Sequence, residues 1–278
     1  MKKTSLKRRY RSFLLVVMTL LGGGVSGCTS QIVTPMQSDG WSAQPLINMN
    51  RFSSDANLDS ATGIPVGDEG YYLYILSDAA NWDFSSSSSL VFSIWRHPWA
   101  HSWIILESPK DRLEFGHTGD FGLATARYHE GVIQRGRAGD PNPIAYLWET
   151  MADGEFQNGR PNRPPSFVWR MPISQRHHQL IQEYVADRKY DTFGLRNNNC
   201  TDMVAKTASL AGIFLTHRIR LTLPPETKFL GQTLRVWTDP QYRILEFSTP
   251  EILEMELRQL ARMGIGSDVT EWYLALKR

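Results

Sequence analysis

Cysteine content places the strongest constraint on how this chain can fold. Its 278 residues include two cysteines, Cys28 and Cys200, so at most one disulfide could form within the chain. With 41% hydrophobic and 21% charged residues, the composition is that of a globular protein with apolar material for one core. We therefore predict one domain that is stabilised by its hydrophobic core and not by disulfides.

The N-terminal segment has the pattern of an export signal. Six basic residues precede an apolar run, Phe13 to Leu21, that is too short to span a bilayer comfortably. The next residues, Val25-Ser26-Gly27-Cys28, resemble the lipobox of bacterial lipoproteins. The resemblance implies that residues 1–27 are removed and that Cys28 anchors the mature protein to membrane lipid in the bacterial cell envelope, facing the periplasm. An ordinary signal peptide followed by a chance cysteine is the alternative.

Loss of the signal changes the electrostatic character of the protein. The whole chain has 30 basic and 28 acidic residues, and removal of the six signal bases leaves 24 basic residues and a net charge of −4. No basic footprint for nucleic acid remains, so we exclude nucleic acid as a partner. Lipidation of Cys28 also leaves Cys200 as the one free thiol, which is exposed to oxidation unless it is buried or functional.

The remaining chain divides into a tether and a domain. Residues 28–67 are polar and lack periodicity, as expected of a lipid-anchored tether, and residues 68–278 are expected to form the domain. Tyr71–Leu76 is predicted to be a strand, and the serine-rich segment Asp83–Ser89 a loop. Pro and Gly residues from Gly136 to Pro172 predict an irregular excursion with a short helix near 144–151. Phe167–Arg170 is predicted to be a strand.

Capping residues predict where three helices begin. Ser174 precedes a helix that runs to about Arg188, and Asn199 precedes one that ends near Gly212. Ser248-Thr249-Pro250-Glu251 has the capping and N-terminal proline pattern of a third helix, 252–263. Cys200 therefore lies in the first turn of its helix.

A β-hairpin is expected between His101 and Gly119. His101–Glu107 and Asp111–His117 are rich in apolar and aromatic residues, and Pro109 lies in the turn between them. A turn centred on Pro109 fixes the cross-strand partners. It pairs Ile105 with Leu113, Trp103 with Phe115, and His101 with His117.

These segments suggest a thiol active site. A cysteine in the first turn of a helix is close to unpaired amides, which favour the thiolate and can stabilise an oxyanion. An imidazole and a polar group that orients it would complete an acyl-transfer site. The alternative is that Cys200 is a small buried core residue and that His101 and His117 only pack.

The same residues carry a family resemblance. Asn199-Cys200-Thr201-Asp202-x-Val204, preceded by Tyr190, resembles the cysteine block of the circularly permuted NlpC/P60 superfamily, a papain-like group that includes lecithin:retinol acyltransferase relatives and bacterial lipoproteins. His101-Ser102-Trp103-Ile104 resembles its histidine strand. The resemblance implies an α+β papain-like fold, with a small antiparallel sheet packed on the cysteine helix. It also implies Cys200 as nucleophile, His101 as base and His117 as third residue, with Glu114 as a substitute.

The expected function is hydrolysis or transfer of an acyl group in the cell envelope, with no cofactor. A peptidoglycan peptide and a lipid acyl chain are the two substrates considered. A non-catalytic envelope lipoprotein that keeps the fold for binding is the alternative function. A zinc site is a further alternative, because His97 and His101 would share one face of a helix and could join His117 or Glu107.

Overall fold

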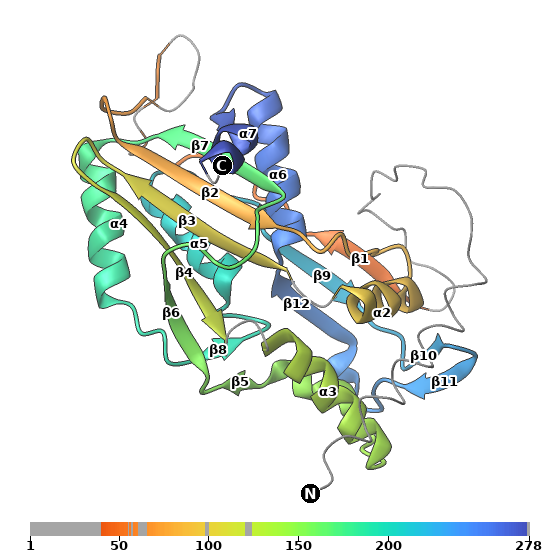
Figure 1. Cartoon of the computed structure of the whole chain (residues 1–278). Coiled ribbons are helices and arrows are strands. Elements are labelled where there is room, and N and C mark those ends of the chain that lie inside the picture. Colours follow the sequence, from red (N-terminus) through yellow and green to blue (C-terminus); the bar gives the residue numbers. More distant parts are fainter. Residues whose placement is uncertain are drawn as a thin grey trace, which may run out of the picture. The chain divides into compact units, whose positions relative to one another are not determined.

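A six-stranded antiparallel sheet forms the centre of the protein (Figure 1). The computed structural model describes residues 40–54, 56, 58–60, 66–97, 100–119 and 124–276, with the backbone only at 124–130 and 229. The predicted signal, residues 1–27, and Cys28 lie outside these residues. The strand order is β13-β7-β2-β3-β4-β6. The strands are β2 (Tyr72–Asp78), β3 (His101–Glu107), β4 (Arg112–Gly119), β6 (Gly154–Asn158), β7 (Phe167–Pro172) and β13 (Ser267–Asp268).

Three smaller antiparallel sheets accompany the central one. The first has the order β1-β9-β12, and the other two pair β10 with β11 and β5 with β8. Their strands are β1 (Ser42–Pro45), β5 (Thr150–Met151), β8 (Phe193–Gly194), β9 (Arg218–Thr222), β10 (Glu226–Phe229), β11 (Gln232–Arg235) and β12 (Ile244–Ser248).

The domain begins earlier than the sequence suggested. Trp41 and Ala43 are buried in a core cluster with residues of β9 and β12, and Arg51 forms an ion pair with Glu256. Residues 41–54, which fall within the predicted tether, therefore pack as part of the domain, because Trp41 and Ala43 bury apolar side chains and Arg51 pairs with Glu256.

Helices cover both faces of the central sheet. On one face α5 (Cys200–Leu210) contacts β3 and β4, α6 (Pro250–Arg262) contacts β2 and β7, and α4 (Gln175–Asp187) contacts α5. On the other face α7 (Thr270–Ala275) contacts β7. The other helices in the described residues are α2 (Ser87–Arg96), α3 (Ala124–Arg137) and the 3-10 turns η2 (Pro143–Trp148) and η3 (Pro240–Arg243). No described helix is long and apolar enough to cross a membrane.

Local capping chemistry determines the helix starts. Ser174 and Asn199 each accept a hydrogen bond from a backbone amide of the first turn, which confirms these two predicted N-caps. Thr249 caps the third helix in the same way, and that helix begins at Pro250, two residues before the predicted start. The predicted loop Asp83–Ser89 is wrong in its second half, because Ser86 caps α2 and draws Ser87–Ser89 into the helix. The predicted excursion after Gly136 contains β5, β6 and η2.

Alternate residues of β2 and β3 point into two separate cores, one on each face of the central sheet. Ile75 and Ile104 pack toward α5 and α6, whereas Leu76 and Trp103 pack with Tyr273 of α7. Burial of each such side chain contributes roughly 1.5–3 kcal/mol. Adjacent residues of a strand point to opposite faces, so Ser102 shares the face of Ile104 and His101 that of Trp103.

The register of the β3–β4 hairpin differs by one residue from the prediction. Ile104 pairs with Phe115, Ile105 with Glu114 and Glu107 with Arg112. The loop has four residues, Ser108–Asp111, and is closed by a 2.8 Å hydrogen bond from Ser108 N to Asp111 O. Continuing this register places Ser102 opposite His117, so the predicted facing of His101 and His117 is wrong.

Candidate active site

Cys200 is the first residue of α5, as predicted. The Asn199 side chain accepts a 3.0 Å hydrogen bond from Asp202 N, and the Asp202 carboxylate accepts a 3.2 Å bond from Asn199 N. This reciprocal capping box fixes where the helix begins. The backbone amides of the first turn have no carbonyl partner within the helix and point toward its N-terminal end.

Hydroxyl and backbone groups surround the Cys200 thiol, which is 6% exposed. Sγ lies 3.8 Å from Thr201 Oγ1, which in turn lies 3.1 Å from Ser102 Oγ. Burial raises the pKa of the Cys200 thiol, and hydrogen bonds from the Ser102 backbone, the Thr201 hydroxyl and the Ser102 hydroxyl oppose that rise. No imidazole is among the hydrogen-bond partners of Sγ in the described part of the chain.

His101 begins β3 on the face of Trp103 and is hydrogen-bonded to Gln157 of β6. His101 Nε2 donates a 2.6 Å bond to Gln157 Oε1, while Gln157 Nε2 donates a 3.0 Å bond to Gly159 O. The second bond fixes the amide orientation, so Oε1 is the acceptor and Nδ1 of His101 is the unprotonated nitrogen. The imidazole stacks on Trp103, with ring centroids 5.5 Å apart. Burial lowers the pKa of His101 to about 4, so its ring is neutral at pH 7.

Gly116 makes room for this hydrogen bond. Pairing between β3 and β4 ends at Ile104 and Phe115, and β4 continues beside β6 with Gly116 opposite Gln157. A Cβ atom on Gly116 would lie 3.0 Å from Gln157 Oε1 and 3.2 Å from Trp103 Cβ. The absent side chain therefore lets His101 reach across β4 to Gln157.

His117 lies in β4 in a different environment. Its Nδ1 is 3.2 Å from Arg188 Nη2, and its ring contacts Tyr190 and Phe193 edge-on. Burial and the Arg188 guanidinium lower the pKa of His117 to about 4. The hairpin register does not bring it opposite His101, so the structure gives no support for His117 as the residue that orients the base.

Glu114 is bound to aromatic side chains. Its carboxylate accepts a 2.8 Å hydrogen bond from Trp103 Nε1 and a 2.5 Å bond from Tyr273 OH. Burial, together with the hydrogen bond to Glu114, raises the pKa of Tyr273. Glu114 thus links β4 to α7, and the bond that orients His101 comes from Gln157.

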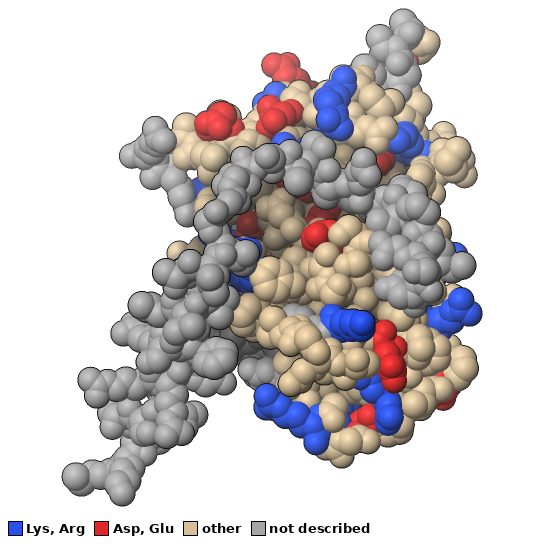
Figure 2. Space-filling model, turned by 90° about the vertical axis from the view of Figure 1, so that its right-hand side faces the viewer, with Lys and Arg blue, Asp and Glu red and all other residues tan. Residues whose placement is uncertain are grey.

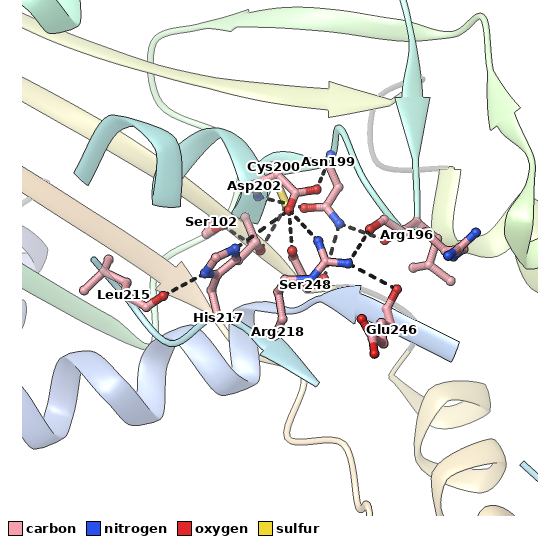
Figure 3. Close-up of polar contacts among 12 residues, drawn as sticks. Ser102, Arg196, Asn199, Cys200, Asp202, Leu215, His217, Arg218, Glu246 and Ser248 are labelled. Atoms are coloured by element: carbon pink, nitrogen blue, oxygen red, sulfur yellow. Dashed lines mark hydrogen bonds and ion pairs between the residues drawn. The ribbon is translucent and has the colours of Figure 1, made fainter. Parts of the chain in front are cut away.

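A polar network holds the start of α5 against β9 and β12 (Figure 3). Asp202 accepts a short hydrogen bond from Ser248 Oγ, and Arg218 Nη1 lies 3.6 Å and His217 Nε2 3.9 Å from the same carboxylate oxygen. Asn199 adds a 3.2 Å bond from its amide to Ser248 O. These contacts fix the helix that carries Cys200, and the Asp202 charge further disfavours a thiolate.

The zinc alternative required His97 and His101 to share one face of a helix, and the structure does not have this arrangement. α2 ends at Arg96 and His101 begins β3, so His97 and His101 do not share a helix face. The described residues contain no group of three or more His, Cys, Asp or Glu side chains that could hold a metal ion.

Comparisons with family models, with curated proteins and with solved structures find no match to this chain. The assignment of a function therefore depends on the residues of the chain itself.

The sequence did not predict the roles of three residues of this site. They are Gln157 as the partner of His101, Ser102 as a contact of the Cys200 thiol, and Asp202 as the centre of the polar network. Gln157 lies in a segment predicted to be irregular, and nothing local to it indicates that it pairs with β4. Ser102 was detectable, because alternation along β3 puts it on the same face as Ile104, which packs toward α5.

Proposed function

We propose that the mature protein is a lipid-anchored cysteine hydrolase or acyltransferase of the cell envelope. Cys200 is the nucleophile, His101 the base, and Gln157 the positioning residue that orients His101. Two observations carry the proposal: Cys200 begins α5 in contact with Ser102, and the neighbouring residue His101 is oriented by a 2.6 Å bond from its Nε2 to Gln157 Oε1 on the opposite face of β3. Cysteine, histidine and a side-chain amide form the triad of papain-like proteases.

The tautomer of His101 supports its role as base. Because Nε2 donates to Gln157, the lone pair resides on Nδ1, and a neutral ring with a free lone pair can accept a thiol proton. The lowered pKa keeps that lone pair available at neutral pH. A papain-like arrangement of the α+β fold, which the Asn199-Cys200 block suggests, belongs to the same proposal.

The chemical steps follow from these roles. Cys200 Sγ attacks a carbonyl carbon and its proton passes to His101 Nδ1, a transfer that requires the His101 ring to reach the α5 face of β3. First-turn amides of α5 stabilise the oxyanion. The tetrahedral intermediate collapses to a thioester, and the leaving amine or alcohol takes the proton from His101. Water then regenerates the thiol in hydrolysis, whereas an acceptor amine or alcohol does so in transfer.

The substrate is an amide or ester within reach of a membrane-tethered domain. Peptidoglycan peptides and lipid acyl chains both satisfy this requirement. Incubation of the purified protein with muropeptides, and separately with phospholipid and acyl-ester vesicles, followed by mass spectrometry, distinguishes them. Cys200→Ala should abolish turnover of the true substrate, while Ser209→Ala on the same helix retains it. Turnover by Cys200→Ala would refute the proposal.

A non-catalytic envelope protein is the second candidate, and one observation favours it. Burial raises the pKa of the Cys200 thiol, and its described hydrogen-bond partners are hydroxyl and backbone groups only. If this candidate is right, no substrate class is turned over, and Cys200→Ala behaves as the wild type in cells.

A further inference from the structure

Helix α2 presents apolar side chains on both of its sides. Leu90 is buried and Ile94 packs against the same core cluster. On the outward side Val91 is 36%, Phe92 38% and Trp95 59% exposed. The outward side of a surface helix is normally polar, so these three side chains form an unpartnered apolar face.

The outward face has the chemistry of a membrane interface. The Phe92 and Trp95 rings lie 6.0 Å apart, and the Arg96 guanidinium lies 5.7 Å from the Phe92 ring centre. The sequence of α2 contains no acidic residue. Aromatic rings beside a cation suit the boundary between acyl chains and anionic headgroups.

The neighbouring β10–β11 hairpin extends this face. α2 contacts β10, and Ser87 Oγ lies 2.7 Å from Thr227 Oγ1. Leu230 at the hairpin turn is 75% exposed. Lys228 and Arg235 are exposed on the hairpin, beside one exposed carboxylate, Glu226. The view in Figure 2 is toward the side of the molecule where Figure 1 places α2 and β10; the described middle of that face is largely uncharged, and both basic and acidic residues lie along its lower part.

The length of the chain limits the distance between this face and the predicted anchor. Trp41 belongs to the same buried cluster as Leu90, and Trp41 Nε1 donates a 3.1 Å bond to Phe84 O, just before α2. Only residues 29–40 separate Trp41 from Cys28. However these residues are arranged, they span at most about 45 Å, so a lipid on Cys28 would hold Trp41 within that distance of the bilayer, with α2 packed in the same cluster.

We propose that the outward face of α2, with the β10–β11 turn, docks on the anionic surface of the membrane that holds the lipid anchor. Phe92 and Trp95 insert at the headgroup boundary and Arg96 pairs with lipid phosphate. α2 is followed closely by β3, so docking brings the strand that carries His101 to the lipid surface. The docking does not depend on Cys200 being a nucleophile.

Vesicle sedimentation tests the docking without the anchor. The mature polypeptide from Cys28, produced without its signal and therefore without lipid, is mixed with phosphatidylethanolamine–phosphatidylglycerol vesicles or with phosphatidylcholine vesicles. We expect binding to the anionic vesicles that weakens with salt. Phe92→Ser and Trp95→Ser should each weaken it roughly tenfold, because each removes one inserted ring.

Two matched variants serve as controls. Trp272 and Met255 are 39% and 38% exposed on other helices, so Trp272→Ser and Met255→Ser should bind like the wild type. Circular dichroism of all four variants checks that they fold. Absence of vesicle binding by the wild type would overturn the proposal, as would equal loss in the controls. A vesicle-independent dimer that Phe92→Ser dissolves would assign the face to a second copy of the chain and would also overturn it.

Discussion

Gln157 Oε1 accepts a 2.6 Å hydrogen bond from His101 Nε2, and this bond joins two strands on either side of β4. The residue between them in the sheet is Gly116, which has no side chain to block the contact. The imidazole is therefore held in a single tautomer with its lone pair on Nδ1. The proposed acyl-transfer chemistry requires that tautomer.

Substitution of Gln157 should alter both the rate and the pH dependence of turnover. Gln157→Ala frees the ring to move, and we expect kcat to fall on the order of 100-fold. Gln157→Glu retains an acceptor and adds a negative charge, which stabilises imidazolium and raises the pKa of His101 above its value of about 4. The acid limb of the kcat/KM profile should move to higher pH in Gln157→Glu. An unchanged limb would show that Gln157 acts only structurally.

Substitutions of His117 and Glu114 should have little effect on kcat. His117 is next to Arg188, and Glu114 is bound to Trp103 and Tyr273, so neither orients the base. Steady-state kinetics of His117→Gln and Glu114→Gln test this directly. A loss in either variant as large as that in Gln157→Ala would reassign the third position of the site.

The helix caps could be predicted from the sequence, whereas the contacts of His101 could not. The caps at Asn199, Ser174 and Thr249 were predictable because each depends on bonds within one helical turn. The facing of His101 and His117 was not, because an error of one residue in loop length exchanges the two faces of a strand. Gln157 could not be found at all, since its role depends on β6 pairing with β4 across a long connection.

Buried Glu251 should make stability depend on pH. Burial raises its pKa from 4.5 to about 7, although Ala80 N and the Thr249 hydroxyl donate hydrogen bonds to it. The folded state therefore holds a proton that the unfolded state has lost between these values, so Glu251 contributes a decrease in the free energy of unfolding as pH rises from 4.5 to about 7, opposite in sign to the contributions of His101 and His117, whose pKa values are lowered to about 4. The decrease is on the order of 3 kcal/mol. Urea unfolding of the wild type and of a Glu251 variant across this range measures it as the difference between the two proteins.

A matched pair of variants separates the Glu251 effect from the rest of the protein. Glu251→Gln removes the titrating proton, so the stability of the wild type relative to Glu251→Gln should fall by about 3 kcal/mol between pH 4.5 and 7. Glu246→Gln, on β12, should retain the pH dependence of the wild type. A pH dependence unchanged by Glu251→Gln would mean that another group titrates.

The Asn199 cap should contribute more to stability than the Ser86 cap. Asn199 accepts from Asp202 N and also donates to Leu195 O and Ser248 O, whereas Ser86 caps only the exposed helix α2. Loss of an N-cap lowers the free energy of unfolding by about 1 kcal/mol. The loss in Asn199→Ala should be larger than this value, and the loss in Ser86→Ala should not. Equal losses by urea unfolding would contradict the role of Asn199 in anchoring α5.

Acylation of Cys200 is the most direct test of the proposed chemistry. The protein is incubated with an activated acyl ester, quenched in acid and digested, and the position of the acyl group is read by mass spectrometry. We predict a thioester on Cys200 that is absent from Cys200→Ala and forms roughly 100-fold or more slowly in His101→Ala. An unmodified Cys200 in the wild type, or acylation of His101→Ala at the wild-type rate, would contradict the account.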